Sequence, residues 1–384
     1  ITNNIDLSGE GGLVWIKQRN ATRDHALFDT ERGTGKYIRS NQTTEESTQN
    51  LAVSAFNSNG FSLGGSNGIT NNSSQDYVSW TFRKAPKFFD VVTYTGDGTN
   101  GRQISHNLGH NVGMAIIKKT SASGDWWVWH RSAPNNTMGI LNGTNAFTTS
   151  AINSEYPSEV FGDGNFDQDP TSTFFEVSSF ASNENGVTYV AYLFAHNDGD
   201  GDFGDGSQDI IKCGSFTEVS GSDVKVTLGF EPQWIMIKVT STTGGWGMYD
   251  VMRGWTSGSD DFALSANTSN AESNVGDRWL IHPDGFTWKN TGNTRDIIYM
   301  TIRRGPLAAP TDATKVFSID TLGTSAPYFD SNHIVDMALV KSAGATSDWY
   351  NYARHIGEKY LKTNGTAAEA NASEAGFDFM DGHI

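Results

Sequence analysis

The chain of 384 residues has a single cysteine, Cys213, so no intrachain disulfide framework can stabilise its fold. We expect Cys213 to be buried in a strand. Proline is rare, with 9 residues, and no run of 18 apolar residues could cross a membrane. Lysine and arginine total 27 against 43 acidic residues, which gives a formal net charge of −16. Nucleic acid and anionic bilayers attract clustered positive charge, so we expect no nucleic-acid partner and no membrane insertion.

The chain also lacks the apolar period of 3.6 residues that marks amphipathic helices, which predicts very little helix. It contains no P-loop and no H-E-x-x-H zinc motif. A pair of carboxylates that meets only in space stays possible, because such pairs have no sequence signature. From these absences we predict that the protein is not an enzyme. Its 42 glycines, with many Asn, Ser and Thr residues, favour short strands joined by tight turns.

What the sequence does contain is one pattern that occurs four times. An apolar run ends in a lysine, and seven residues later a second run begins, in most copies rich in aromatic residues. The four lysines are Lys17, Lys118, Lys238 and Lys341. A constant interval between two such runs predicts one hairpin used repeatedly. The first run has no polar alternation, so we expect its strand to be covered on both faces.

The four copies lie about a hundred residues apart, which is long enough for each to enclose a core of its own. We therefore predict an all-β fold, a tandem array of antiparallel β-sandwich modules of about 100 residues. Four such modules in a row would make an arm of about 130 Å. We interpret the chain as part of a longer polypeptide, with the fourth module incomplete. The predicted modules are 1–83, 88–195 with an acidic insertion at 153–169, 209–304, and 314–384.

The acidic linker after the second module is the strongest candidate for a metal site. Asp198, Asp200, Asp202 and Asp209 stand at positions one, three, five and twelve, as the oxygen ligands of a calcium loop do. The linker departs from the EF-hand pattern, because Phe203 stands where the sharp turn requires glycine. Two interpretations stay open, a Ca²⁺ site and a hinge of solvated carboxylates.

The aromatic run of the second module is a candidate for binding glycans, because Trp126 and Trp127 could stack on sugar rings. Consecutive side chains of a strand point to opposite faces, so at most one face of this run can be exposed. The alternative is burial in the core, where one aromatic side chain removes about 150–250 Å² from water.

A second recurring feature pairs an acidic residue with an arginine three positions later. Asp29 precedes Arg32 in this way, and Asp250 precedes Arg253. A pair that recurs from module to module favours an ion pair that closes a hairpin over a catalytic pair, since a catalytic site is normally built once.

Several segments resemble a known family. They read GGLVWIKQR, YVSWTFRKAPKFFDVVTYTG, YVAYLFAHNDGDGDFG, GFEPQWIMIK and IRRGPLAAPT. They are similar to the repeated domain of virion structural proteins of marine tailed phages, of the cyanophage and pelagiphage kind, which are often called tail-fibre proteins. The resemblance covers nearly all of residues 11–384.

This resemblance implies a structural component of the virion, extracellular in location, that extends from the particle and contacts the host surface. The partners it implies are further copies of the chain, expected as a homotrimer, together with other virion proteins and a host glycan. It implies no catalytic residue. Two other hypotheses stay open, a secreted or surface array of carbohydrate-binding modules that uses tryptophans and calcium, and a polysaccharide depolymerase.

Overall fold

The structure is a computed structural model, and it describes residues 1–134, 137–148, 170–179, 181–255, 261–305, 309–324, 327–356, 359–372 and 382–383. The acidic insertion predicted at 153–169 lies outside these residues. Within them, almost all regular structure is antiparallel strand, and the helices are three single turns of 3-10 helix. These turns are η1 (Val251–Arg253), η2 (Ala313–Lys315) and η3 (Arg354–Ile356). The predicted all-β fold class is confirmed.

We number four repeats by the strands that follow one another along the chain. Repeat 1 comprises β1 (Gly12–Gln18), β2 (Ala26–Asp29), β3 (Lys36–Tyr37), β4 (Ser47–Thr48), β5 (Val53–Asn57), β6 (Gly60–Leu63) and β7 (Tyr77–Arg83). Repeat 2 comprises β8 (Phe89–Thr95), β9 (Arg102–Ser105), β10 (Val112–Lys119), β11 (Trp127–His130), β12 (Gly139–Ile140), β13 (Phe174–Val177) and β14 (Thr188–Ala195).

Repeat 3 comprises β15 (Ile211–Glu218), β16 (Val224–Thr227), β17 (Pro232–Val239), β18 (Trp246–Asp250), β19 (Phe262–Ser265), β20 (Ser273–Asn274), β21 (Trp279–His282), β22 (Gly285–Trp288) and β23 (Arg295–Arg303). Repeat 4 comprises β24 (Phe329–Asp330), β25 (Met337–Val340), β26 (Tyr350–Ala353), β27 (Lys359–Lys362), β28 (Ala370–Asn371) and β29 (Gly382–His383).

The first three repeats share one three-stranded unit. The strand that ends near the repeated lysine lies in the middle, between the strand of its hairpin and the last strand of the repeat. These units are β2-β1-β7, β11-β10-β14 and β18-β17-β23. Their registers are the same, as the pairs of the middle strand with the last strand show. The pairs are Leu13–Phe82, Trp15–Trp80 and Lys17–Val78; Met114–Phe194, Ile116–Tyr192 and Lys118–Val190; Trp234–Ile302, Met236–Met300 and Lys238–Ile298.

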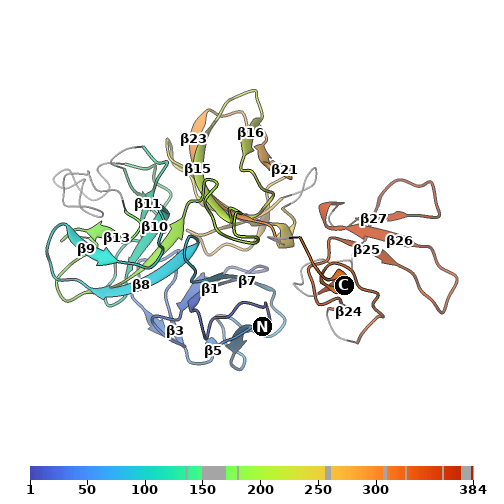
Figure 1. The fold of residues 1–384 in the computed structure, drawn as a ribbon, viewed down its shortest axis with the longest axis horizontal. Helices are drawn as coiled ribbons and strands as arrows, with labels where there is room; N and C mark the ends of the chain where they lie inside the picture. Colours follow the sequence, from blue (N-terminus) through green and yellow to red (C-terminus); the bar gives the residue numbers. More distant parts are fainter. Residues whose placement is uncertain are drawn as a thin grey trace.

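The three repeats pack around one shared core instead of lying in a row. A single cluster of buried side chains joins the facing sides of the three units. At its centre the ring of Phe82 packs edge-on against Phe194 of repeat 2 and Trp234 of repeat 3, with centroids 5.5 and 5.7 Å apart. Figure 1 shows the three repeats gathered about this centre. The linear arm expected for these repeats is therefore wrong, because the face of each sheet is covered by its neighbours.

The opposite faces of the sheets enclose smaller cores within the repeats. In repeat 3 the six-stranded sheet β15-β23-β17-β18-β19-β20 faces the three-stranded sheet β16-β22-β21. Ile235 and Tyr249 of the first pack with Trp279 and Phe286 of the second. The middle strands β1, β10 and β17 are thus buried on both sides, as their uninterrupted apolar runs predict.

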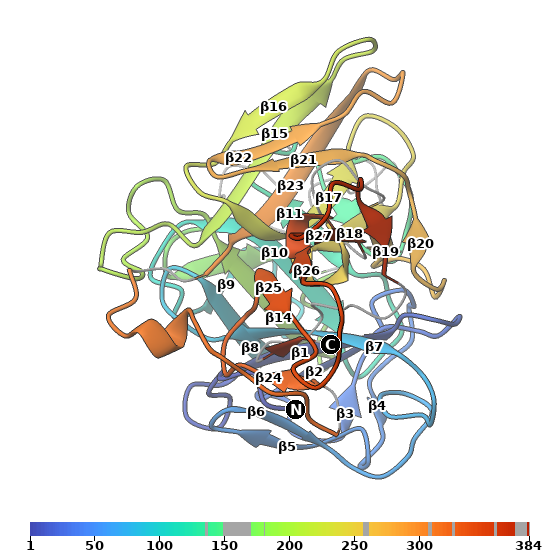
Figure 2. The ribbon, with the colours of Figure 1, turned by 90° about the vertical axis from the view of Figure 1, so that its right-hand side faces the viewer.

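Repeat 4 lies outside this body, to its right in Figure 1 and in front of it in Figure 2. Its sheet has the order β25-β26-β27-β28, which matches β17-β18-β19-β20 of repeat 3. The middle-strand prediction is wrong here. Ala338 of β25 is buried in a small core with Val335, but its neighbours Met337 and Leu339 are 62% and 52% exposed. These two side chains stand where Leu13 and Trp15 are buried in repeat 1.

Candidate functional site

The described residues of repeats 1–3 form three contacts between repeats, and these contacts are alike. Each joins the hairpin of one repeat to a polar loop of another. We call these segments the junction hairpin, residues 17–25, 118–126 and 238–246, and the asparagine loop, residues 39–46, 140–147 and 265–272. The hairpin of repeat 1 contacts the loop of repeat 3, that of repeat 2 contacts repeat 1, and that of repeat 3 contacts repeat 2. The contacts therefore close into a ring.

Backbone hydrogen bonds hold each junction in the same way. The amides of Arg23, Gly124 and Gly244 donate to the carbonyls of Ser269, Thr43 and Thr144, and all three N···O distances are 2.8 Å. A second bond runs back from the loop at each junction. The amides of Glu272, Glu46 and Phe147 donate to the carbonyls of Arg19, Thr120 and Thr240 over 2.7–3.0 Å. Six equivalent bonds in a cyclic order describe a threefold arrangement built within one chain.

A ring nitrogen completes each junction. Trp126 Nε1 donates to the carbonyl of Arg39 over 2.9 Å, and Trp246 Nε1 donates to that of Ile140 over 2.9 Å. At the third junction His25 takes this position, with its Nε2 3.0 Å from the carbonyl of Ser265. The imidazole ring of His25 is smaller than an indole ring, and a larger side chain, Trp15, lies beside it. The Nδ1 atom of His25 accepts a hydrogen bond from the indole of Trp15, whose counterparts in the other repeats are Ile116 and Met236.

The repeated lysine is buried at each of the three junctions. Lys118 Nζ donates to the carbonyl of Thr43 over 3.2 Å, and Lys238 Nζ donates to that of Thr144 over 3.0 Å. Lys17 Nζ donates to the carbonyl of Gln18 over 2.6 Å. Burial lowers the pKa of Lys17, Lys118 and Lys238 to about 8. The ammonium groups of Lys118 and Lys238 therefore link carbonyls of two repeats at a cost in desolvation, whereas that of Lys17 bonds only within its own repeat.

The predicted ion pairs of Asp29 with Arg32 and Asp250 with Arg253 are confirmed, and they also reach across the junctions. In each pair the arginine Nε lies 2.6 Å from the carboxylate. The hydroxyl of Tyr192 in repeat 2 donates to Asp29 over 2.8 Å.

The carboxylate of the second ion pair, Asp250 with Arg253, accepts a hydrogen bond from repeat 1. The indole of Trp80 donates to Asp250 over 2.9 Å. The guanidinium of Arg253 lies over the Trp80 ring, 5.3 Å from its centroid. Each of these two carboxylates thus accepts hydrogen bonds both from its own arginine and from an aromatic side chain of another repeat.

At the position of repeat 2 that corresponds to Asp29 and Asp250, the side chain is His130. Its Nε2 lies 3.0 Å from the carbonyl of Tyr299 in repeat 3. Burial lowers the pKa of His130 to about 3, and burial together with the nearby Lys17 does the same for His25. Both histidines are therefore neutral at physiological pH.

The glycan site predicted at Trp126 and Trp127 is wrong in this structure. Trp126 is 0% exposed and lies inside the junction with repeat 1, and Trp127 is 6% exposed within the shared core. Neither ring face is open to a sugar. The alternation of side chains along the strand allows at most one face of this run to be exposed. It could not show that a neighbouring repeat covers that face.

The carboxylates of the predicted calcium loop all have protein partners, and two of them share Lys212. Asp198 pairs with Lys212, Asp200 with His110 and Asp202 with Lys87. Asp209 accepts hydrogen bonds from the amides of Gly199 and Gly201 and also pairs with Lys212. The structure thus spreads these side chains over several contacts instead of directing them at one point.

Among the residues that the structure describes, no group of three or more His, Cys, Asp or Glu side chains could hold a metal ion. No described helix is long and apolar enough to span a membrane. The prediction for Cys213 is confirmed, because it lies buried in β15, and burial raises the pKa of its thiol.

The asparagine loops are the functional feature that the sequence analysis did not assign. Asn41, Asn142 and Asn267 accept hydrogen bonds from the amides of His25, Trp126 and Trp246, which fixes the ring that enters the junction. The signal was present in the sequence, because Asn41 and Asn142 both stand 24 residues after the repeated lysine.

Comparison with known proteins gives one match. A family model described as a domain of unknown function (DUF7483) matches residues 4–306, and the chain belongs to that family. The matched segment covers repeats 1–3, which form the closed ring, and ends before repeat 4. No curated protein and no solved structure matches the chain.

Proposed function

We propose that this member of the DUF7483 family is a structural component of a tailed-phage virion, a tail fibre or another appendage that contacts the host surface. One observation carries the proposal. The side chains that recur from repeat to repeat serve contacts between repeats, as Lys118, Trp126 and Arg253 do. Residues that are repeated for such contacts hold a structural assembly together, whereas a catalytic centre is normally built once.

The resemblance of the repeated segments to virion proteins of marine tailed phages supports the same role. The geometry refines the shape of the appendage. Repeats 1–3 would form a compact head, held by three junctions, and repeat 4 would connect or extend it. We propose further that the chain has no catalytic activity and lies on the extracellular particle, beside other virion proteins.

The test is the composition of the particle. Virions are purified from the phage that encodes the chain, and their proteins are identified by mass spectrometry. We expect peptides from all four repeats in stoichiometric amounts, and antibodies against repeat 3 should label the tail or another projection in electron micrographs. Absence of the chain from purified virions, with its presence in the lysate, would overturn the proposal. Release of reducing ends from host polysaccharide by the purified chain would overturn its non-enzymatic part.

A further inference from the structure

Repeat 3 is joined to the rest of the closed ring by a longer linker than the one between repeats 1 and 2. Residues 196–210 separate β14 from β15, whereas residues 84–88 separate β7 from β8. The longer linker contains Gly199, Gly204 and Gly206 at positive φ, a conformation that few other residue types adopt. Such a segment permits repeat 3 to move relative to repeats 1 and 2 when the contacts across the ring are broken.

The side chain of His25, at the contact of repeat 1 with repeat 3, is fixed as a neutral imidazole by its two partners. An indole N–H can only donate, so Nδ1 of His25 accepts the hydrogen bond from Trp15 over 2.9 Å. A carbonyl can only accept, so Nε2 carries the proton and donates to Ser265 of repeat 3 over 3.0 Å. A second proton would bind at Nδ1 and face the N–H of Trp15. Protonation therefore replaces a hydrogen bond by two opposed donors.

His130 is fixed in the same way at the contact of repeat 2 with repeat 3. Its Nδ1 accepts a hydrogen bond from the amide of Ser132 over 3.2 Å, and its Nε2 donates to the carbonyl of Tyr299 over 3.0 Å. His25 and His130 are 0% and 3% exposed. A second proton on either ring thus places a charge and an opposed pair of donors at a site shielded from solvent.

The charged groups around His25 do not compensate a second proton. Burial lowers the pKa of His25 most, and the cations Lys17 of its own hairpin and Arg253 of repeat 3 lower it further. The carboxylates of this junction already have partners. Asp24 accepts hydrogen bonds from two side-chain amides, and Glu272 pairs with two arginines.

The surroundings of His130 are no more favourable to a second proton. Burial lowers the pKa of His130 most, and Arg131 and His196 add to this effect. The strands of repeat 3 that face it supply the thiol of Cys213 and the phenol of Tyr299, and burial raises the pKa of both. None of these four groups supplies a negative charge below pH 7.

The contact between repeats 1 and 2 has other residues at the two equivalent positions. The indole of Trp126 takes the place of His25. Asp29 takes the place of His130 and accepts a hydrogen bond from Tyr192. Histidine is the side chain whose charge ordinarily changes near neutral pH, and neither of these bonds contains one. Mild acid therefore acts on the contacts of repeat 3 and not on these two bonds.

We propose that His25 and His130 form an acid-sensitive switch, and that their protonation releases repeat 3 from repeats 1 and 2, which stay joined. Repeat 3 then moves away on the linker 196–210. The open form binds two more protons than the closed form, so a fall in pH favours it. The ratio of open to closed molecules should rise about a hundredfold for each pH unit between roughly pH 5.5 and 4. This inference concerns the isolated chain and is independent of the virion proposal.

Distances between repeats are measured with pairs of spin labels by double electron–electron resonance as the pH is lowered from 7 to 4. Ser54→Cys with Thr227→Cys reports on repeats 1 and 3, and Ser54→Cys with Thr93→Cys reports on repeats 1 and 2; all three positions are exposed. The native Cys213 is buried and is not labelled at pH 7. We expect the first distance to lengthen in acid and the second to stay the same. A first distance that is unchanged down to pH 4, or a second distance that lengthens with it, would overturn the proposal.

Substitution of the histidines tests the cause of the opening. Glutamine has one acceptor and one donor, as neutral imidazole has, but it takes up no proton. His25→Gln with His130→Gln should remove the response of the first distance to pH. Each single variant should retain about a tenfold change in the ratio per pH unit, which tests the assignment even where the double variant is open at pH 7.

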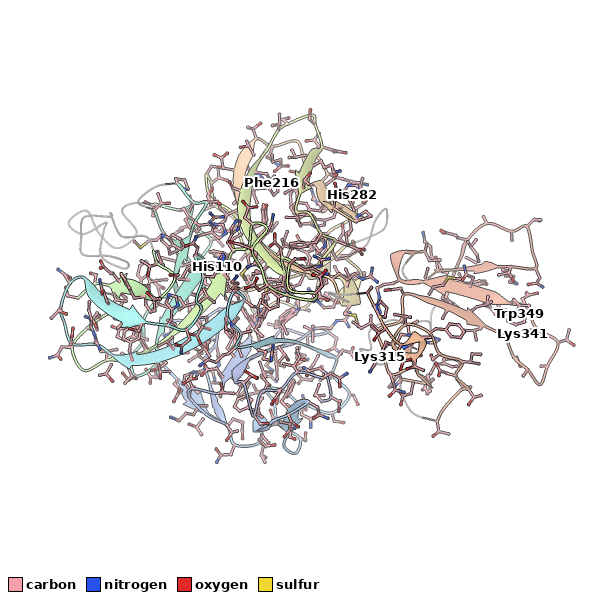
Figure 3. The ribbon with its side chains drawn as sticks, viewed as in Figure 1. His110, Phe216, His282, Lys315, Lys341 and Trp349 are labelled. Atoms are coloured by element: carbon pink, nitrogen blue, oxygen red, sulfur yellow. The ribbon has the colours of Figure 1, made fainter. Side chains whose placement is uncertain are left out.

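The matched control is His282→Gln. His282 bonds to Thr287 within repeat 3, and Figure 3 shows it on the outer part of that repeat, away from repeat 1. This variant should open in acid as the wild type does. Loss of its response to pH, or single variants that open as steeply as the wild type, would contradict the assignment to His25 and His130.

Discussion

Repeats 1–3 and repeat 4 contain the same hairpin, but only the first three have a neighbour that covers it. Trp126 and Trp349 are both held by the side chain of an asparagine that follows in the next loop. One is fully buried and the other 44% exposed. A local sequence pattern thus determines the hairpin and its ring, whereas burial depends on what another repeat supplies. The repeated residues therefore serve contacts between units as well as the fold of one unit.

The largest expected effect compares the two tryptophans directly. Trp126→Ala should destabilise the fold by about 3–5 kcal/mol, because it leaves a cavity inside a packed junction. Trp349→Ala should change the free energy of unfolding by at most about 0.5 kcal/mol, because its ring is exposed. Urea unfolding of dilute protein, where association does not contribute, measures both. Equal losses would contradict the distinction between covered and uncovered junctions.

The next effect concerns the arginine pairs. Asp250→Asn should cost about 3 kcal/mol, because it leaves the buried Arg253 without its main counter-charge. Asp336 of repeat 4, which pairs with Arg304 and Arg354, is half exposed, so Asp336→Asn should cost at most about 1 kcal/mol. Thermal unfolding followed by tryptophan fluorescence compares the two variants. A smaller loss at Asp250 than at Asp336 would show that the pair does not support the junction.

Acid should weaken the closed ring through its buried histidines. The folded-state pKa of His25 and His130 is about 3, against about 6.5 when unfolded. Between these values the unfolded chain binds more protons, so stability falls as pH falls below 6.5. By pH 4.5 each histidine should cost up to about 2–3 kcal/mol.

A variant that copies repeat 2 sharpens this test. Trp15→Ile with His25→Trp places the residue types of Ile116 and Trp126 in the first junction, with little change in total volume. Its free energy of unfolding should vary less between pH 6.5 and 4.5 than that of the wild type. His25→Trp alone should destabilise by about 1–3 kcal/mol through overpacking against Trp15. An unchanged pH dependence in the double variant would exclude His25 as the acid-sensitive group.

The smallest effect involves the buried lysines. With a folded-state pKa of about 8 and an unfolded value of about 10.4, Lys118 makes stability rise with pH between these values. Burial raises the pKa of tyrosines such as Tyr192, and these lower stability only above about pH 10. We therefore expect the free energy of unfolding to increase from pH 8 to 10. Lys118→Met should reduce the slope by less than about 1.4 kcal/mol per pH unit, and denaturation at fixed ionic strength measures it.

The sequence was sufficient for the parts of the fold that depend on local patterns. The interval between Lys118 and Asp125 predicted a hairpin, and the uninterrupted apolar run before Lys118 predicted a strand buried on both faces. The spacing of Asp29 and Arg32 predicted their ion pair. Each of these features follows from residues that are close in the chain or that share one strand period.

What the sequence could not supply was the arrangement of the repeats. A run of apolar side chains on the face of Trp80 and Phe82 fits a sandwich partner in the same repeat as well as a neighbouring repeat. The linear arm and the exposed platform at Trp126 were both wrong for this reason. The acidic linker shows the same limit, because position numbers along a loop do not reveal that Asp200 turns to His110 and Asp202 to Lys87.

The junction between repeats 3 and 1 has a consequence for synthesis of the protein. Arg19 and Glu272, which pair across it, are separated by 253 residues. Translation therefore has to pass repeat 3 before the last contact can form. Until then the face of Trp80 and Phe82 lacks the contacts that Asp250 and Trp234 of repeat 3 supply. Contacts between residues this far apart in the sequence form slowly, and the folding intermediates expose apolar surface that is prone to aggregate. We therefore expect chaperones to increase the yield of folded chain by shielding this face during that interval.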